Sequence, residues 1–213
     1  MSSEQLTSIL GRISVEIWLA HEALGVYAAS AEAAQALQGR NFNHLFGVIQ
    51  RHARDALILS VCNLFEKPNK SYPNYSVPSA LAKIEDTCDW QEVTPLNSIP
   101  KLHEFIRQRI EPAFDICQPD AELTAAQLVF EYFKQECPGC SGERKNNALG
   151  DALDAVKVLR DKRVAHVENH DLEGLPQADF GGIIKLLCFA EDFDRFVSLG
   201  LFGFSLAAEA RPE

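Results

Sequence analysis

Apolar residues recur every three or four positions along most of the chain, which is the spacing that places them on one face of a helix. No segment alternates apolar and polar residues convincingly over the length of a strand, so we expect an all-α helical bundle. Four helices should form its core, and they are predicted over residues 3–37, 42–65, 147–166 and 178–199. Shorter helices are predicted over residues 79–88, 99–116 and 123–136.

Proline divides these helical segments. The stretch "EKPNKSYPNYSVPSA" contains three prolines, whose rings prevent a helix from continuing, and it predicts an irregular connection over residues 67–78. Ser79 is then the expected N-cap of the helix that follows. A length of 213 residues suits one domain, so we expect residues 1–213 to form a single all-helical domain.

The composition is that of an ordinary globular protein, with 46% hydrophobic and 23% charged residues. The formal net charge of -10 argues against a protein that coats nucleic acid through a broad basic surface, but a small phosphate site remains compatible with it. The polar start "MSSEQLTSIL" has no signal segment, and no long apolar run follows, so we expect a cytoplasmic protein with no membrane segment.

Six scattered cysteines indicate reduced thiols rather than a disulfide framework. Two of them, Cys137 and Cys140, enclose a Pro-Gly pair, and we expect an exposed turn with two incidental thiols. A structural zinc site needs four ligands and no second close pair is present, so zinc shared with His103 or with another chain is the alternative.

Cations and imidazoles gather in the stretch "VLRDKRVAHVENH", near the end of the helix predicted over residues 147–166. His exchanges protons near neutral pH, and Arg grips phosphate oxygens in pairs. Together they suit metal-free cleavage of a phosphodiester, in which His moves the protons and Arg stabilises the charged transition state. The alternative is that the basic residues only cap the C-terminus of a helix, where the macrodipole favours cations.

The order of these residues resembles the signature of the HEPN superfamily, in which an Arg, commonly followed by Asn or Asp, precedes a His late in a helical bundle. In "LRDKRVAH" these places are held by Arg160, Asp161 and His166. The stretch "DALILSVCNLFEKPNKSYPNYSVPSALAKI" is similar to the abortive-infection AbiU-like branch, with its acidic helix tip, loop and short helix. The resemblance covers residues 42–86 and 145–199.

This resemblance implies a metal-independent endoribonuclease acting on RNA in phage defence or in a toxin-antitoxin pair, with no cofactor. It also implies a homodimer in which two copies of the motif face one cleft, and an antitoxin as a partner. The alternative is a non-catalytic helical module that keeps the fold for dimerisation or partner binding, because fold alone does not establish activity.

Helical geometry leaves the choice of arginine open. Residues six apart, such as Arg160 and His166, lie about 120° apart and about 9 Å along a regular helix. Arg163 and His166 are three apart and share a face. Arg160 is the arginine that matches the motif, and Arg163 is the alternative arginine that helical geometry places beside His166. Asn63 and Glu66, near the end of the second helix, are candidate supporting polar residues, with helix capping as the alternative.

Overall fold

The computed structural model describes residues 3–37, 42–69, 74–90, 93, 102–110, 125–140, 147–161 and 180–202. Every regular element in these ranges is a helix, which confirms the all-α prediction. In chain order the elements are α1 (Ser3–Ala36), α2 (Asn43–Leu64), α3 (Val77–Thr87), α4 (Leu102–Phe105), η1 (Ile106–Ile110), α5 (Ala125–Glu136), α6 (Asn147–Leu159), α7 (Phe180–Phe193), η3 (Asp194–Leu199) and α8 (Gly200–Phe202). No helix in the described part of the chain is both long and apolar enough to cross a membrane.

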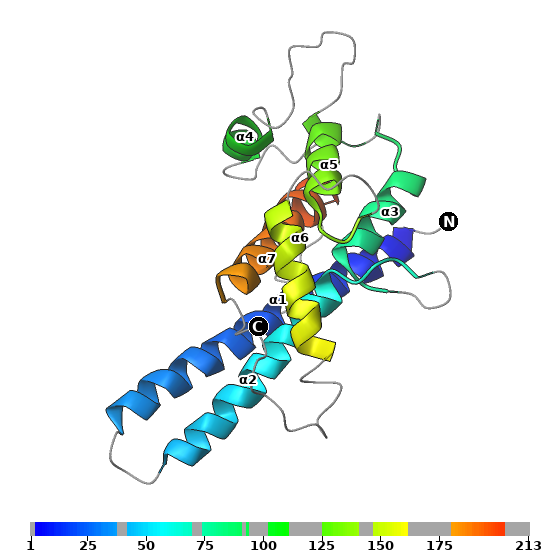
Figure 1. The fold of residues 1–213 in the computed structure, drawn as a ribbon. Coiled ribbons are helices and arrows are strands. Elements are labelled where there is room, and N and C mark those ends of the chain that lie inside the picture. The colour runs from blue at the N-terminus through cyan, green and yellow to red at the C-terminus, as the bar shows by residue number, and fades with distance from the viewer. Residues whose placement is uncertain are drawn as a thin grey trace, which may run out of the picture.

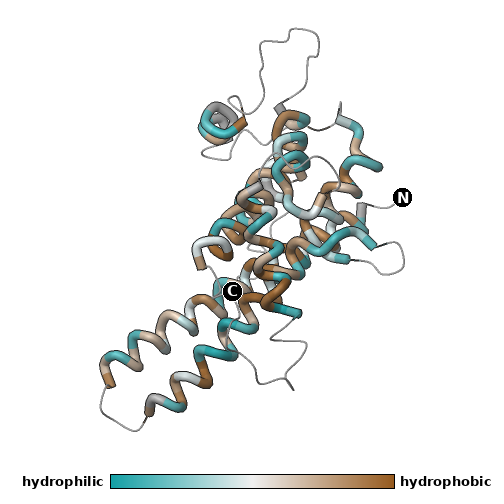
Figure 2. Tube along the Cα trace, in the orientation of Figure 1, coloured by the Kyte–Doolittle hydropathy of each residue, from teal (hydrophilic) through white to brown (hydrophobic). Residues whose placement is uncertain are grey.

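Helices α1 and α2 pack side by side as a long hairpin, and their joined ends extend beyond the remaining helices (Figure 1). In the half of the hairpin that contacts the other helices, α1 buries Leu10, Ile13 and Ala20. Near the outer end, large apolar side chains such as Phe42 and Leu45 are about half exposed. Figure 2 shows hydrophilic and hydrophobic residues interspersed along that end of the hairpin. The inner half of the hairpin is therefore the part that belongs to the core.

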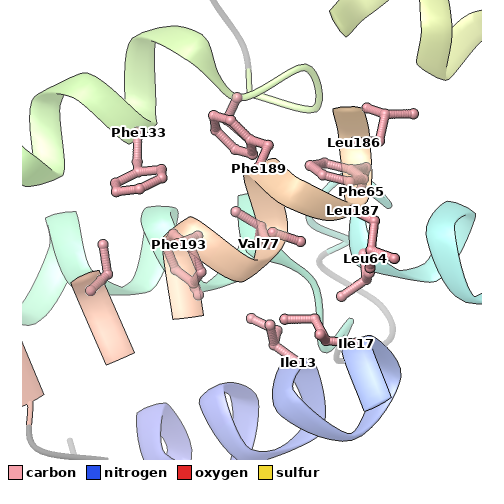
Figure 3. Close-up of a cluster of buried hydrophobic side chains, with 14 of the residues drawn as sticks. Ile13, Ile17, Leu64, Phe65, Val77, Phe133, Leu186, Leu187, Phe189 and Phe193 are labelled. Carbon is pink, nitrogen blue, oxygen red and sulfur yellow. The ribbon is translucent and has the colours of Figure 1, made fainter. Parts of the chain in front are cut away.

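Aromatic rings fill the core where α5 and α7 meet the hairpin. Phe133 of α5 is fully buried and lies edge-on to Phe189 and Phe193 of α7, with ring centroids 5.4 and 5.6 Å apart. Phe65, at the end of α2, reaches the same cluster through Phe189, at a centroid distance of 6.0 Å. Figure 3 shows these rings above Ile13 of α1. One continuous core therefore holds the end of α2 in place.

The start of α3 corrects one expectation. The N-cap is Ser76, whose Oγ accepts a hydrogen bond from the Ser79 N–H at 3.3 Å, and the helix runs from Val77 to Thr87. The predicted N-cap at Ser79 is wrong because Pro78 lies inside the first turn. Proline is tolerated there, since the N–H groups of a first turn have no partner within the helix.

The third predicted helix, over residues 99–116, is described over residues 102–110, where α4 passes directly into η1. Phe105 fixes this segment to the core, because its ring stacks on Phe196 at a centroid distance of 4.1 Å. The remaining parts of that prediction, residues 99–101 and 111–116, lie outside the described residues.

Candidate active site

Arg160 follows directly on α6, where that helix ends against the core. Helix α6 packs on α2 and α7 and buries Leu153, Val156 and Leu159. Because these residues recur at helical spacing, they fix the rotation of α6 about its axis. Leu159 is 1% exposed, whereas the side chain of the next residue, Arg160, is 32% exposed. The guanidinium therefore lies at the boundary between the core and solvent.

The neighbouring carboxylate of Asp161 holds this guanidinium. Arg160 donates from Nε and from Nη2 to the same oxygen, Oδ1 of Asp161, at 2.8 and 2.7 Å. The pKa of Arg160 is raised, first by this hydrogen bond and then by the nearby charges of Asp161 and Glu66. Since Asp161 is 61% exposed, the pair orients Arg160 and adds little to stability.

Cys62 of α2 lies close to Arg160 and is buried. Burial raises the pKa of this thiol to about 11, although the positive charges of Arg160 and Lys157 lower it in part. The thiol is therefore protonated at neutral pH and is a poor nucleophile.

Glu66 brings a second carboxylate to the same place from the end of α2. The negative charge of Glu66 helps to raise the pKa of both Arg160 and Cys62, which places it near them. The buried Ser76 donates from Oγ to the Glu66 carbonyl oxygen at 2.6 Å and thereby ties the end of α2 to the start of α3. Asn63, one turn earlier, is exposed.

Comparison with known families gives one match. The model of the HEPN family described as AbiU2 matches residues 3–203 of the chain. The chain belongs to the AbiU2 family of HEPN proteins. This confirms the resemblance to the AbiU-like branch and extends it over the middle of the chain. No curated protein and no solved structure matches the chain.

Within this AbiU2-family protein, the structure pairs Arg160 with Asp161 and brings the negative charge of Glu66 near them. Asn63 lies in the last turn of α2, three residues before Glu66. Arg163 and His166 lie outside the described residues, so their place in the site stays a prediction. Sequence reasoning missed two neighbours of Arg160. Lys157 is three residues before Arg160 on α6, so helical spacing could have found it. Cys62 comes from another helix, and no local signal points to it.

The turn from Cys137 to Cys140 corrects a second expectation. Cys137, Pro138 and Gly139 are buried and Cys140 is half-buried, so the turn is not exposed. It packs against the end of α2 and the start of α3. A Cβ added at Gly139 would lie 2.9 Å from the carbonyl oxygen of Phe65 and closer still to Cγ of Pro78. In the described part of the chain, no group of three or more His, Cys, Asp or Glu side chains could hold a metal ion.

Gly139→Ala is expected to destabilise the fold by about 1–3 kcal/mol, because the added methyl group meets the backbone of Phe65 and the rigid ring of Pro78. Gly47→Ala is the matched control. Nothing lies within 4 Å of a Cβ at this position on α2, so alanine should stabilise the helix by about 0.5–1 kcal/mol. Denaturant unfolding of both variants measures the two changes. Changes of the same sign would contradict the close packing of the turn.

Proposed function

We propose that this AbiU2-family protein is a metal-independent endoribonuclease of the HEPN type that acts in phage defence or in a toxin-antitoxin system. The observation that carries the proposal is the position of Arg160. Its guanidinium is part-exposed at the end of α6, is oriented by Asp161, and lies six residues before His166 in the sequence. Membership of the HEPN AbiU2 family adds to this support.

The proposed reaction is transfer of a phosphoryl group within the RNA chain. His166 takes the proton of a ribose 2′-hydroxyl, and the 2′-oxygen forms a bond to the adjacent phosphorus. The bond from phosphorus to the 5′-oxygen of the next nucleotide breaks, and an imidazolium returns a proton to that oxygen. The products are a 2′,3′-cyclic phosphate and a 5′-hydroxyl. Arg160 neutralises the charge that develops on the phosphoryl oxygens.

The pair of Arg160 and Asp161 has a defined role in this scheme. Asp161 binds the Nε–Nη2 edge of the guanidinium. A phosphate would therefore use the Nη1–Nη2 edge, which is the other face that can form two parallel hydrogen bonds. Asp161 would act as a positioning residue, because it aims the second edge without touching the substrate.

The test is cleavage of total RNA by the purified protein in EDTA. We expect cleavage to persist with the chelator and to give fragments ending in a 2′,3′-cyclic phosphate. The comparison of Arg160→Lys with Arg163→Lys then identifies the arginine that binds phosphate. Arg160→Lys should lower the cleavage rate roughly 10–100-fold, because an ammonium cannot make the paired contact. A larger loss in Arg163→Lys would transfer this role to Arg163, and cleavage abolished by EDTA would contradict the mechanism.

We also propose that the protein is a homodimer, which would place two copies of the site in one cleft. Support comes from two exposed apolar side chains on the helices that lead to the site, Leu59 on α2 and Val158 on α6, each 39% exposed. Light scattering at micromolar concentration should give twice the monomer mass, and the double variant Leu59→Asp, Val158→Asp should give a monomer. A monomeric parent protein would contradict the proposal.

Two observations favour a second function. Arg160 already pairs with the carboxylate of Asp161 within the protein, and the chain carries a net charge of -10, which opposes RNA binding. In this alternative the protein is a non-catalytic helical module for dimerisation or for binding a partner such as an antitoxin. Absence of RNA cleavage, together with an intact dimer, would favour this alternative.

A further inference from the structure

The cysteine pair at the end of α5 is in direct contact. The N–H of Cys140 donates to the carbonyl oxygen of Cys137 at 3.3 Å, which closes a turn of four residues. The thiol of Cys137 donates a hydrogen bond to the sulfur of Cys140. Both side chains therefore point to the same side of the turn.

This turn matches the geometry of a disulfide. A four-residue turn brings its end Cα atoms within about 7 Å, and a disulfide needs a Cα separation of about 4.4–6.8 Å. Because the two thiols already share a hydrogen bond across this turn, a bond between their sulfurs needs little movement of the backbone. The packing of Gly139 against Phe65 and Pro78 holds the turn in this form.

The two thiols differ in their surroundings, as an attacking and a resolving thiol must. Cys137 is fully buried, and burial raises its pKa well above the ordinary value. The hydrogen bond from Cys137, followed by the charge of Lys134, lowers the pKa of Cys140. The pKa values of the other described cysteines, Cys62, Cys88 and Cys188, are all raised. Cys140 is therefore the best nucleophile among the described thiols.

A pocket of about 290 Å³ opens beside Cys140. Its lining includes Lys67, Leu81 and Glu85 in addition to Lys134 and Cys140. Lys134 pairs with Glu85, which holds the ammonium group at the edge of this pocket. The space is enough for part of a small molecule next to the sulfur, with two ammonium groups and one carboxylate around it.

We propose that Cys137 and Cys140 are a redox-active dithiol that reacts through Cys140 with low-molecular-weight disulfides entering this pocket. The thiolate of Cys140 attacks one sulfur of the small disulfide, a mixed disulfide forms, and one small thiol leaves. Cys137 then loses its proton and attacks the sulfur of Cys140, and the second small thiol leaves. In sum, two protein thiols are oxidised to one disulfide and the small disulfide is reduced to two thiols.

The test treats the reduced full-length protein with oxidised glutathione, quenches with an alkylating reagent, and maps the products by mass spectrometry. The peptide with Cys137 and Cys140 should lose two hydrogen atoms and take up no alkyl group. Cys137→Ala should instead accumulate one glutathione on Cys140, because the resolving thiol is gone. Cys140→Ser should show neither product, while its Cys188 alkylates as in the parent.

The proposal is overturned if the parent protein forms no bond between Cys137 and Cys140 under these conditions, a result that needs no variant to fold. It is also overturned if Cys140→Ser, with its helical spectrum intact, accumulates glutathione on Cys137 as fast as the parent forms its disulfide. The measurement is the mass of a peptide and involves no RNA. The redox proposal can therefore fail while the proposed ribonuclease activity holds, and the reverse is equally possible.

Discussion

His166→Ala is expected to reduce the rate of RNA cleavage by a factor of about 10²–10⁴, which is the usual effect of removing a group that transfers protons in the transition state. The helical fold should survive, because the sequence predicts His166 at the end of a helix, where a side chain contributes little to a core. Cleavage of a labelled RNA in EDTA measures the loss, and far-ultraviolet circular dichroism measures the fold.

His170→Ala is the matched control, since it removes an imidazole from the same stretch of sequence but outside the Arg-to-His motif. We expect this variant to cleave RNA at nearly the parental rate. If His166→Ala retained full activity, the proposed acid-base role would be wrong, and the non-catalytic module would be the better account. If both variants lost activity equally, the position of His166 in the Arg-to-His motif would not distinguish it from His170 as the catalytic residue.

The helices were predictable from the sequence because their signal is local. In α1, for example, the apolar residues Leu6, Leu10, Ile13 and Ile17 follow helical spacing, and the last three are buried in the structure. Helical spacing needs no knowledge of what the helix packs against. The N-cap of α3 differs from the prediction because proline, which usually ends a helix, here lies in the first turn. Ser76, Val77 and Pro78 instead form the cap and its first turn.

The burial of the turn from Cys137 to Cys140 could not be predicted. Pro and Gly between two polar stretches are typical of an exposed loop. Here Gly139 of the turn lies against Phe65 and Pro78, which precede it by 74 and 61 residues in the chain. Contacts of this kind arise only when α2, α3 and α5 pack together. The same packing holds the turn across which the two thiols share a hydrogen bond.

The candidate site was predictable in part. The order of Arg160, Asp161 and His166 led to the proposed chemistry, and the hydrogen bonds between Arg160 and Asp161 follow from their adjacency. The approach of Glu66 depends on how α2 packs against α6, and no periodicity in either helix encodes it. The sequence also gave no reason to place the buried Cys62 near the guanidinium.

Phe133→Ala is expected to lower the free energy of unfolding by about 3–5 kcal/mol, which is the usual cost of removing a large aromatic side chain from a core. Phe133 is fully buried, and its ring contacts Phe189 and Phe193 of α7 as well as Phe105. Alanine would leave a cavity between α5 and α7 that these rings cannot fill without shifting. Denaturant unfolding measures the change directly.

In thermal unfolding the same loss should lower the melting temperature by roughly 6–20 °C, given about 2–4 °C for each kcal/mol in a chain of this size. Leu45→Ala is the control, because Leu45 is 54% exposed near the outer end of the hairpin and should change the stability by less than about 0.5 kcal/mol. Equal effects of the two variants would contradict the aromatic core. A large effect of Phe133→Ala alone would place the main stabilising contacts where α5 and α7 meet, because the outer half of the hairpin would then contribute little.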